Sequence, residues 1–278
     1  MVFVFLKGKN IIFLIICGGG GYTQYTYKVL NTFTFYKSKQ DLCILNRVLA
    51  LLDIWWLQQI QGAEFHGQLG QDIIAYTILK HKKHGFFVDI AAHDGISSNN
   101  TLLFERLGWN GFCVEANPET FKKLQQNRKC DCYNKAVFSK NIGITRFATT
   151  SADFLDTLEI TMTKNHKERM ENVSSGNVKY IEVQTITFNE LMANYPDVTH
   201  IDFMSLDVEG GELEVLKGID FDKYTFGVMT IEHNYVQSRK MDIINLLHDK
   251  GYRILFENNF DIMFVRNERI GFVAHTAI

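Results

Sequence analysis

The sequence is poor in proline and in net charge. Only 2 of its 278 residues are proline, which favours regular helices and strands joined by short loops. The formal net charge is −2 at pH 7, so the chain lacks the positive field that draws proteins to nucleic acids and anionic membranes. Because no basic run interleaved with aromatic residues occurs either, we expect no nucleic acid among its partners.

Cysteine is scarce and irregularly placed. The chain has 5 cysteines, and Cys130 and Cys132 stand close together with no second pair near enough to complete a four-ligand zinc site. An odd number at irregular spacing favours reduced thiols over a disulfide framework. We therefore expect a cytoplasmic location for the main domain.

The apolar run at the N-terminus, Ile11–Cys17, is shorter than the roughly 20 residues that a transmembrane helix needs. Two interpretations of it stay open. Two lysines precede the run, as in a signal sequence, which would export the protein or attach it to a membrane through residues 1–17. Alternatively, Val2–Leu6 and Ile11–Ile16 pair as a β-hairpin.

The chain divides into a main domain and two flanking segments. We place an N-terminal extension at 1–62, because it contains the glycine-rich break Gly18–Gly21 and then Leu42–Ile60, whose apolar residues have helical spacing. The main domain spans 63–267, and a tail covers 268–278. Nothing in the extension indicates a chemical role.

Apolar runs alternate with amphipathic segments throughout the main domain. The segments expected to form helices are Asp72–Lys80, Asn100–Leu107, Pro118–Asn127, the residues before Asn194, Glu212–Lys217 and Met241–Lys250. The runs expected to form strands are Phe86–Ile90, Gly111–Val114, Cys132–Val137, Ile144–Ala148, a strand ending after Val183, Ile201–Leu206, Gly227–Ile231, Arg253–Glu257 and Asp261–Val265. This order predicts an α/β fold, Rossmann-like and doubly wound, with a mostly parallel sheet and a C-terminal antiparallel hairpin.

Acidic and small residues gather where two of these strands end. Ligands of such sheets bind beyond the carboxyl ends of the strands. Asp89 stands near the end of the first strand, a loop of small residues follows, and Glu115 ends the second strand, where a carboxylate accepts hydrogen bonds from two ribose hydroxyls. The residues that we place at this cofactor site are Asp89, Ala91, His93, Asp94, Gly95, Glu115 and Ala116. His93 also has a plainer interpretation as a loop residue.

The loop AAHDG distinguishes between cofactors. A dinucleotide enzyme needs the pattern G-x-G-x-x-G, in which a helix N-terminus meets a pyrophosphate. Here Asp94 would repel that pyrophosphate, so an NAD-dependent oxidoreductase is disfavoured. S-adenosylmethionine carries a sulfonium and an ammonium instead, and both are compatible with nearby carboxylates.

Six segments carry a resemblance to a known family. In chain order they read GQDIIAYTILK, FFVDIAAHDGISSNNT, GWNGFCVEANPETFKKL, YNKAV, IDFMSLDVEGGELEVLKGIDF and MTIEHN. Together they cover about residues 66–266 and resemble the FkbM-type methyltransferases, with LDVEGGELEVLKG the most specific stretch. The resemblance implies a seven-stranded class I methyltransferase sheet, S-adenosylmethionine as cofactor, and O-methylation of hydroxyls on sugars, glycans or small natural products.

The resemblance also implies roles for single residues. Asp89 and Gly95 would lie at the methionine end of the cofactor, and Glu115 at the ribose. Asn134 and Ala136 would lie near the adenine, and Asp207 would face the transferred methyl group, with Glu209 and Glu212 in the same motif. Ala91 departs from the glycine usual in the family. This departure leaves open a non-catalytic scaffold or binding module.

Transfer to a hydroxyl also requires a group that accepts its proton. The catalytic candidates are Asp207, His233, Glu232, Glu209 and Glu212. Their carboxylates could also hold Mg²⁺, since oxygen ligands suit this ion. Glu209 and Glu212 have the alternative role of capping the next helix. The polar stretch 151–179 is either an acceptor-binding loop or a surface insertion.

Overall fold

The N-terminus forms a small antiparallel sheet. The computed structural model describes the backbone of three strands there, and beyond them residues 66–68, 70–80, 82–151, 154–233, 236–257 and 260–267. Strands β1 (Val2–Lys7), β2 (Asn10–Cys17) and β3 (Thr26–Thr34) follow one another in this sheet. The hairpin interpretation is thus confirmed for the backbone. The helix expected at Leu42–Ile60 and the tail 268–278 lie outside the described residues.

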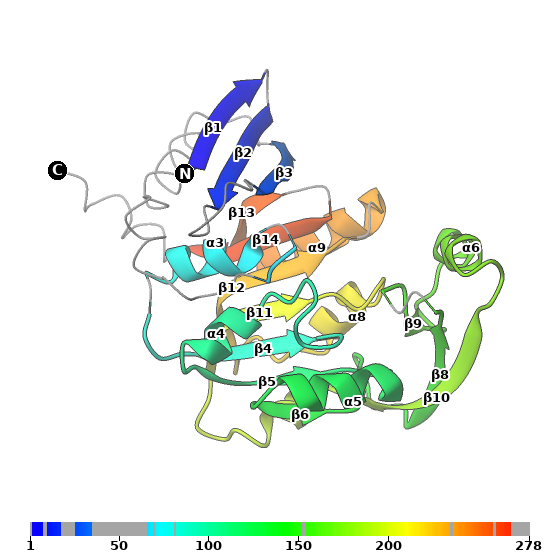
Figure 1. The fold of residues 1–278 in the computed structure, drawn as a ribbon. Helices are drawn as coiled ribbons and strands as arrows, with labels where there is room; N and C mark the ends of the chain where they lie inside the picture. Colours follow the sequence, from blue (N-terminus) through cyan, green and yellow to red (C-terminus); the bar gives the residue numbers. More distant parts are fainter. Residues whose placement is uncertain are drawn as a thin grey trace.

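The main sheet has seven strands in the order β13-β14-β12-β11-β4-β5-β6 (Figure 1). Their bounds are β4 Phe86–Ile90, β5 Asn110–Val114, β6 Asp131–Tyr133, β11 His200–Leu206, β12 Thr225–Glu232, β13 Tyr252–Glu257 and β14 Asp261–Arg266. Neighbours pair in parallel except at β14, which runs antiparallel to both β12 and β13. The predicted mostly parallel sheet with a C-terminal antiparallel hairpin is confirmed.

Helices cover both faces of this sheet. Their bounds are α3 Gln71–Ile78, α4 Leu102–Arg106, α5 Pro118–Asn127, α7 Phe188–Met192, α8 Glu212–Lys217 and α9 Gln237–Asp249. Neighbouring residues of a strand point to opposite faces, so Phe87 packs with buried residues of α3 to α5, and Val88 packs with those of α7 to α9. Two apolar cores therefore enclose the sheet, as a doubly wound fold requires.

Local signals in the sequence explain where some helices begin and end. The side chain of Asn117 accepts a hydrogen bond from the Glu119 amide at 3.0 Å, and Pro118 takes the first helical position of α5, as predicted. Thr187 and Glu190 form a capping box at the start of α7. Gly251 follows α9 with a φ of 83°, a conformation that glycine adopts without strain.

The strand predicted at Cys132–Val137 is in fact divided between two sheets. After β6 the chain turns, and β7 (Ala136–Val137) joins a second sheet of order β7-β10-β8-β9. The turn is held by Asn134, whose side-chain amide donates to the carbonyls of Glu115 and Ala116. Apolar residues stand on both sides of the polar pair Asn134 and Lys135, and this pattern alone does not distinguish two short strands from one.

The second sheet contains the region that looked least regular in the sequence. Its other strands are β8 (Ile144–Thr149), β9 (Thr157–Leu158) and β10 (Lys179–Ile186), and α6 (Lys164–Val173) connects β9 to β10. Of these elements, the sequence predicted β8 and the end of β10. Helix α6 was missed because it is polar and Met170 is its one buried residue. In Figure 1 this sheet and α6 stand to one side of the main sheet.

Candidate active site

A cavity opens where the carboxyl ends of β4, β5 and β11 meet the second sheet. The space between its walls, including the part open to solvent, is about 730 Å³. Of the residues predicted for the site, those that line this cavity are Ala91, His93, Glu115, Ala116, Ala136, Asp207 and Glu209. The order of strands reverses between β4 and β11, which is where ligands of doubly wound sheets bind.

The loop after β4 has an unusual backbone. Ala91, His93 and Gly95 adopt positive φ values of 65°, 52° and 79°. Such a conformation is strained by about 1 kcal/mol for a residue with a Cβ, and glycine avoids that strain. The extra methyl of Ala91 therefore has a structural cost at the position where the family usually has glycine.

Glu115 is the carboxylate that borders the cavity at the end of β5. It accepts hydrogen bonds from the amides of His93 at 3.0 Å and Asn117 at 2.8 Å, so the two strand-end loops meet on it. Burial, opposed by these amides, raises its pKa to about 8. Two ribose hydroxyls would supply hydrogen bonds that favour the ionised form.

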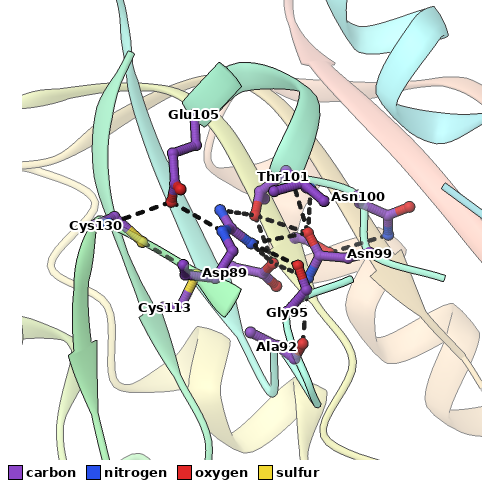
Figure 2. A network of polar contacts seen from close by, with 12 residues as sticks. Asp89, Ala92, Gly95, Asn99, Asn100, Thr101, Glu105, Cys113 and Cys130 are labelled. Atoms are coloured by element: carbon purple, nitrogen blue, oxygen red, sulfur yellow. Dashed lines mark hydrogen bonds and ion pairs between the residues drawn. The ribbon is translucent and has the colours of Figure 1, made fainter. Parts of the chain in front are cut away.

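Asp89 and Gly95 do not line the cavity. Figure 2 shows both residues in a network of polar contacts with Asn99 and Thr101. Asp89 is buried and accepts from Asn99 Nδ2 at 2.9 Å and Thr101 Oγ1 at 2.6 Å. A Cβ on Gly95 would come within 2.6 Å of Cγ of Arg128. Asp89 supports the loop from the strand, and Gly95 packs within the loop against Arg128, where the resemblance implied contact with the cofactor.

Arg128 organises that supporting network, and sequence reasoning missed it. Its guanidinium is fully buried and donates to Glu105 at 2.9 Å, to Asn99 Oδ1 at 3.0 Å and to Thr101 Oγ1 at 3.1 Å. It also lies 4.0 Å from the Asp89 carboxylate. A single arginine after a helix carries no pattern that would have revealed this role.

Two other predicted cofactor residues also have supporting positions. Asp94 accepts hydrogen bonds from the amides of Ile96 at 2.9 Å and Ser97 at 2.7 Å. Asn134 holds the turn after β6, and neither residue lines the cavity. The small-residue loop thus contacts the cavity through Ala91 and His93 alone.

Three carboxylates gather at the carboxyl ends of β11 and β12. One oxygen from each of Asp207, Glu209 and Glu232 lies within 4.8 Å of the others. Asp207 faces the cavity, and its carboxyl group lies beside that of Glu232. Burial, followed by the nearby charge of Asp207, raises the pKa of Glu232 well above its usual value. Burial and the charge of Asp207 therefore both favour the protonated form of Glu232.

Glu212 and His233 do not line the cavity. The Glu212 carboxylate is fully buried and accepts from the amides of Val208 at 3.1 Å and Gly210 at 2.9 Å, which fixes the loop before α8. Burial raises its pKa to about 7. His233 is 3% exposed and lies outside the cavity wall, although it follows β12 as predicted.

The second sheet supplies a wall of the cavity that the sequence did not reveal. Phe154 stacks on the His93 ring, with 4.6 Å between ring centroids. Asp156 accepts from Asn117 Nδ2 and Thr149 Oγ1, both at 2.7 Å. The stretch 151–179 therefore contributes to the site, and polar composition gave no sign of which residues would do so.

The fold and the site together define the class of protein. Class I methyltransferases share three features with this chain. They have a doubly wound seven-stranded sheet, an antiparallel strand second from one edge of it, and an acidic residue at the end of the second strand. Residues 89–254 match the methyltransferase FkbM domain, which is more than half of the chain. The chain belongs to the FkbM methyltransferase family and is an S-adenosylmethionine-dependent methyltransferase.

Other comparisons add little to this assignment. No curated protein matches the chain. Precorrin-6y C5,15-methyltransferase from Geobacter metallireducens is 14% identical, with a TM-score of 0.38 over 72% of this chain and 88% of its own. TrmK of M. capricolum, solved with S-adenosyl-homocysteine, is 12% identical, with a TM-score of 0.32 over 69% of this chain and 67% of its own.

Proposed function

We propose that the protein transfers the methyl group of S-adenosylmethionine to a hydroxyl of a sugar, a glycan or a small natural product. The observation that carries the proposal is Asp207, a carboxylate that faces the cavity beside Glu232, whose pKa is raised by burial and by the charge of Asp207. A sulfonium is a good leaving group, so the enzyme chiefly has to position the acceptor and remove its proton. Asp207 is suited to both tasks.

The two ends of the cavity suggest how the ligands would lie. Glu115 would bind the ribose hydroxyls, and Ala136 with Val137 would border the adenine. In this arrangement Asp207 would lie near both the methyl donor and the acceptor hydroxyl. During attack the hydroxyl proton passes to an Asp207 oxygen, and the new carbon–oxygen bond forms as the carbon–sulfur bond breaks.

The charge of the site limits the chemical classes of acceptor that we expect it to bind. Asp207, Glu209 and Glu232 place acidic groups at the acceptor end, and they would repel a carboxylate or a phosphate on the substrate. We therefore favour a neutral or cationic acceptor, such as an uncharged or an amino sugar. Mg²⁺ would fit the same oxygens, and a loss of activity with EDTA that Mg²⁺ restores would support its presence.

The test is methyl transfer from isotopically labelled S-adenosylmethionine to a panel of neutral glycosides, amino sugars and uronic acids. We expect label in an alkali-stable methyl ether on a neutral or amino sugar. Asp207→Asn should lower kcat by at least about 100-fold, in line with general-base catalysis. Asp249→Asn, at an exposed position of α9, is the matched control and should retain full activity.

Two results would contradict the proposal. Label in an alkali-labile ester or on nitrogen would show a different acceptor chemistry. Binding of S-adenosylmethionine without turnover of any acceptor, together with no effect of Asp207→Asn in cells, would favour the non-catalytic scaffold.

A further inference from the structure

Three thiols meet outside the cavity. Cys113 on β5 and Cys132 on β6 are partners in the parallel pairing of these strands, and Cys130 precedes β6. The sulfur atoms of Cys113 and Cys130 are 3.6 Å apart, and the Cys132 thiol lies 3.4 Å from the Cys130 carbonyl oxygen. Figure 2 shows the Cys113 and Cys130 sulfurs directed toward each other.

The surroundings of the cluster allow it to react. Cys113 is fully buried, whereas Cys130 and Cys132 keep part of their surface exposed, so a small reagent can reach the cluster from one side. Burial raises the pKa of Cys113 above its usual range, the pKa of Cys130 is also raised, and hydrogen bonds with these two thiols lower the pKa of Cys132 to about 4; the positive charge of Arg128 lowers the pKa of all three. Thiols that are partly exposed and next to a positive charge are the kind that oxidise in proteins.

The cluster is connected to the cofactor loop by a short chain of contacts. The Cys130 amide donates to Glu105 at 3.3 Å, and the same carboxylate pairs with Nε of Arg128 at 2.9 Å. The other guanidinium nitrogens of Arg128 hold Asn99 and Thr101, which in turn bind Asp89. A shift at Cys130 therefore acts on the residue that supports the loop.

We propose that Cys113 and Cys130 are an oxidation site, at which a peroxide forms a disulfide between them and weakens the binding of S-adenosylmethionine. This inference concerns the cofactor half of the site and does not depend on the identity of the acceptor. The sulfurs would have to approach by about 1.5 Å, from 3.6 Å to the roughly 2.05 Å of a disulfide. Because Cys113 is fixed within the sheet, Cys130 must move, and Glu105 and Arg128 with it.

The chemistry uses hydrogen peroxide as the oxidant. The Cys130 sulfur attacks a peroxide oxygen, the O–O bond breaks, and a sulfenic acid and hydroxide form. The Cys113 sulfur then attacks the Cys130 sulfur, and the S–S bond forms as the S–O bond breaks and hydroxide leaves. The hydroxides take up the two thiol protons, so two thiols give two electrons and one peroxide becomes two waters.

The experiment treats the full chain with stoichiometric hydrogen peroxide, maps disulfide-linked peptides by mass spectrometry, and measures S-adenosyl-homocysteine binding by calorimetry. We expect a Cys113–Cys130 link and a rise of at least about fivefold in Kd, both reversed by dithiothreitol. Cys130→Ser should abolish the link and the rise in Kd. Cys132→Ser should retain both, and this variant separates the pair from the neighbouring thiol.

Three outcomes would overturn the proposal. One is the absence of a peroxide-dependent link at Cys113, and another is a link that disappears in Cys132→Ser but persists in Cys130→Ser. The third is a Cys113–Cys130 disulfide that forms fully and leaves the Kd of S-adenosyl-homocysteine unchanged. Because the readout is cofactor binding, none of these outcomes bears on whether the acceptor is a hydroxyl.

Discussion

Replacing Arg128 by methionine removes the centre of the network behind the cofactor loop. The guanidinium is fully buried, and it neutralises Glu105 at 2.9 Å and Asp89 at 4.0 Å. Methionine has a similar length and leaves both carboxylates without their positive partner. Breaking a buried ion pair in this way typically costs about 3–5 kcal/mol, because the remaining charge is desolvated and uncompensated.

That cost is large relative to the whole stability of a domain, which is about 5–15 kcal/mol. For a domain of this size each kcal/mol lowers Tm by roughly 2–4 °C, so we expect Arg128→Met to lower Tm by about 10 °C. The loop from Asn99 to Thr101 loses its donors as well, and the Kd of S-adenosyl-homocysteine should rise by at least about tenfold, the equivalent of one charged hydrogen bond.

The assay is urea and thermal unfolding together with calorimetry, and Arg146→Met is the matched control. Arg146 pairs with Glu159 at 3.1 Å, but its side chain is 57% exposed. An exposed pair contributes less than about 1 kcal/mol, so this variant should behave almost as the wild type. The double variant Arg128→Met/Glu105→Gln should recover part of the loss, because one buried charge is gone. A loss below 1 kcal/mol with unchanged cofactor affinity would refute the reasoning.

Four further predictions concern Glu115 and the loop after β4. Glu115→Gln should raise the Kd of S-adenosyl-homocysteine at least about tenfold by calorimetry, since it loses a charged acceptor for the ribose. Because the folded-state pKa of Glu115 is raised from 4.5 to about 8, its burial makes the free energy of unfolding fall as pH rises between these values. Urea unfolding of Glu115→Gln over the same pH range should lack that fall. Ala91→Gly should relieve the backbone strain of a φ of 65° and change the free energy of unfolding by no more than about 1 kcal/mol. It should bind S-adenosyl-homocysteine equally or more tightly, and weaker binding would contradict the idea that Ala91 is strained. Gly95→Ala should cost about 1–3 kcal/mol in urea unfolding, because its Cβ would lie 2.6 Å from Arg128 Cγ, and wild-type stability would contradict this.

The sequence predicted the main sheet well because its strands are short apolar runs between turn residues. Phe86–Ile90 and Glu212–Lys217 were predicted with the bounds that the structure has. The strand at Cys132–Val137 was wrong because Asn134 turns the chain through hydrogen bonds to a distant loop, and such contacts leave no periodic signal. Helix α6 was missed because almost none of it is buried.

The candidate site was predicted in part, for a similar physical reason. Strand ends place Glu115 and Asp207 at one edge of the sheet, and order along the chain is enough to predict this. Whether a residue faces the cavity or supports it from behind depends on packing across the sheet. Asp89 was therefore predicted to contact the cofactor, and no role was predicted for Arg128, which lies 4.0 Å from its carboxylate and supports the same loop.

The most direct test of the central claim is thermal unfolding of the wild type and of Glu115→Gln with S-adenosylmethionine, S-adenosyl-homocysteine and NAD. A ligand at 100 times its Kd stabilises the folded state by about 2.7 kcal/mol, which raises Tm by several degrees. We predict such a rise in the wild type with the first two ligands, a much smaller one in Glu115→Gln at equal concentration, and none with NAD. A rise with NAD alone, or equal rises in both proteins, would contradict a methyl-donor site bordered by Glu115.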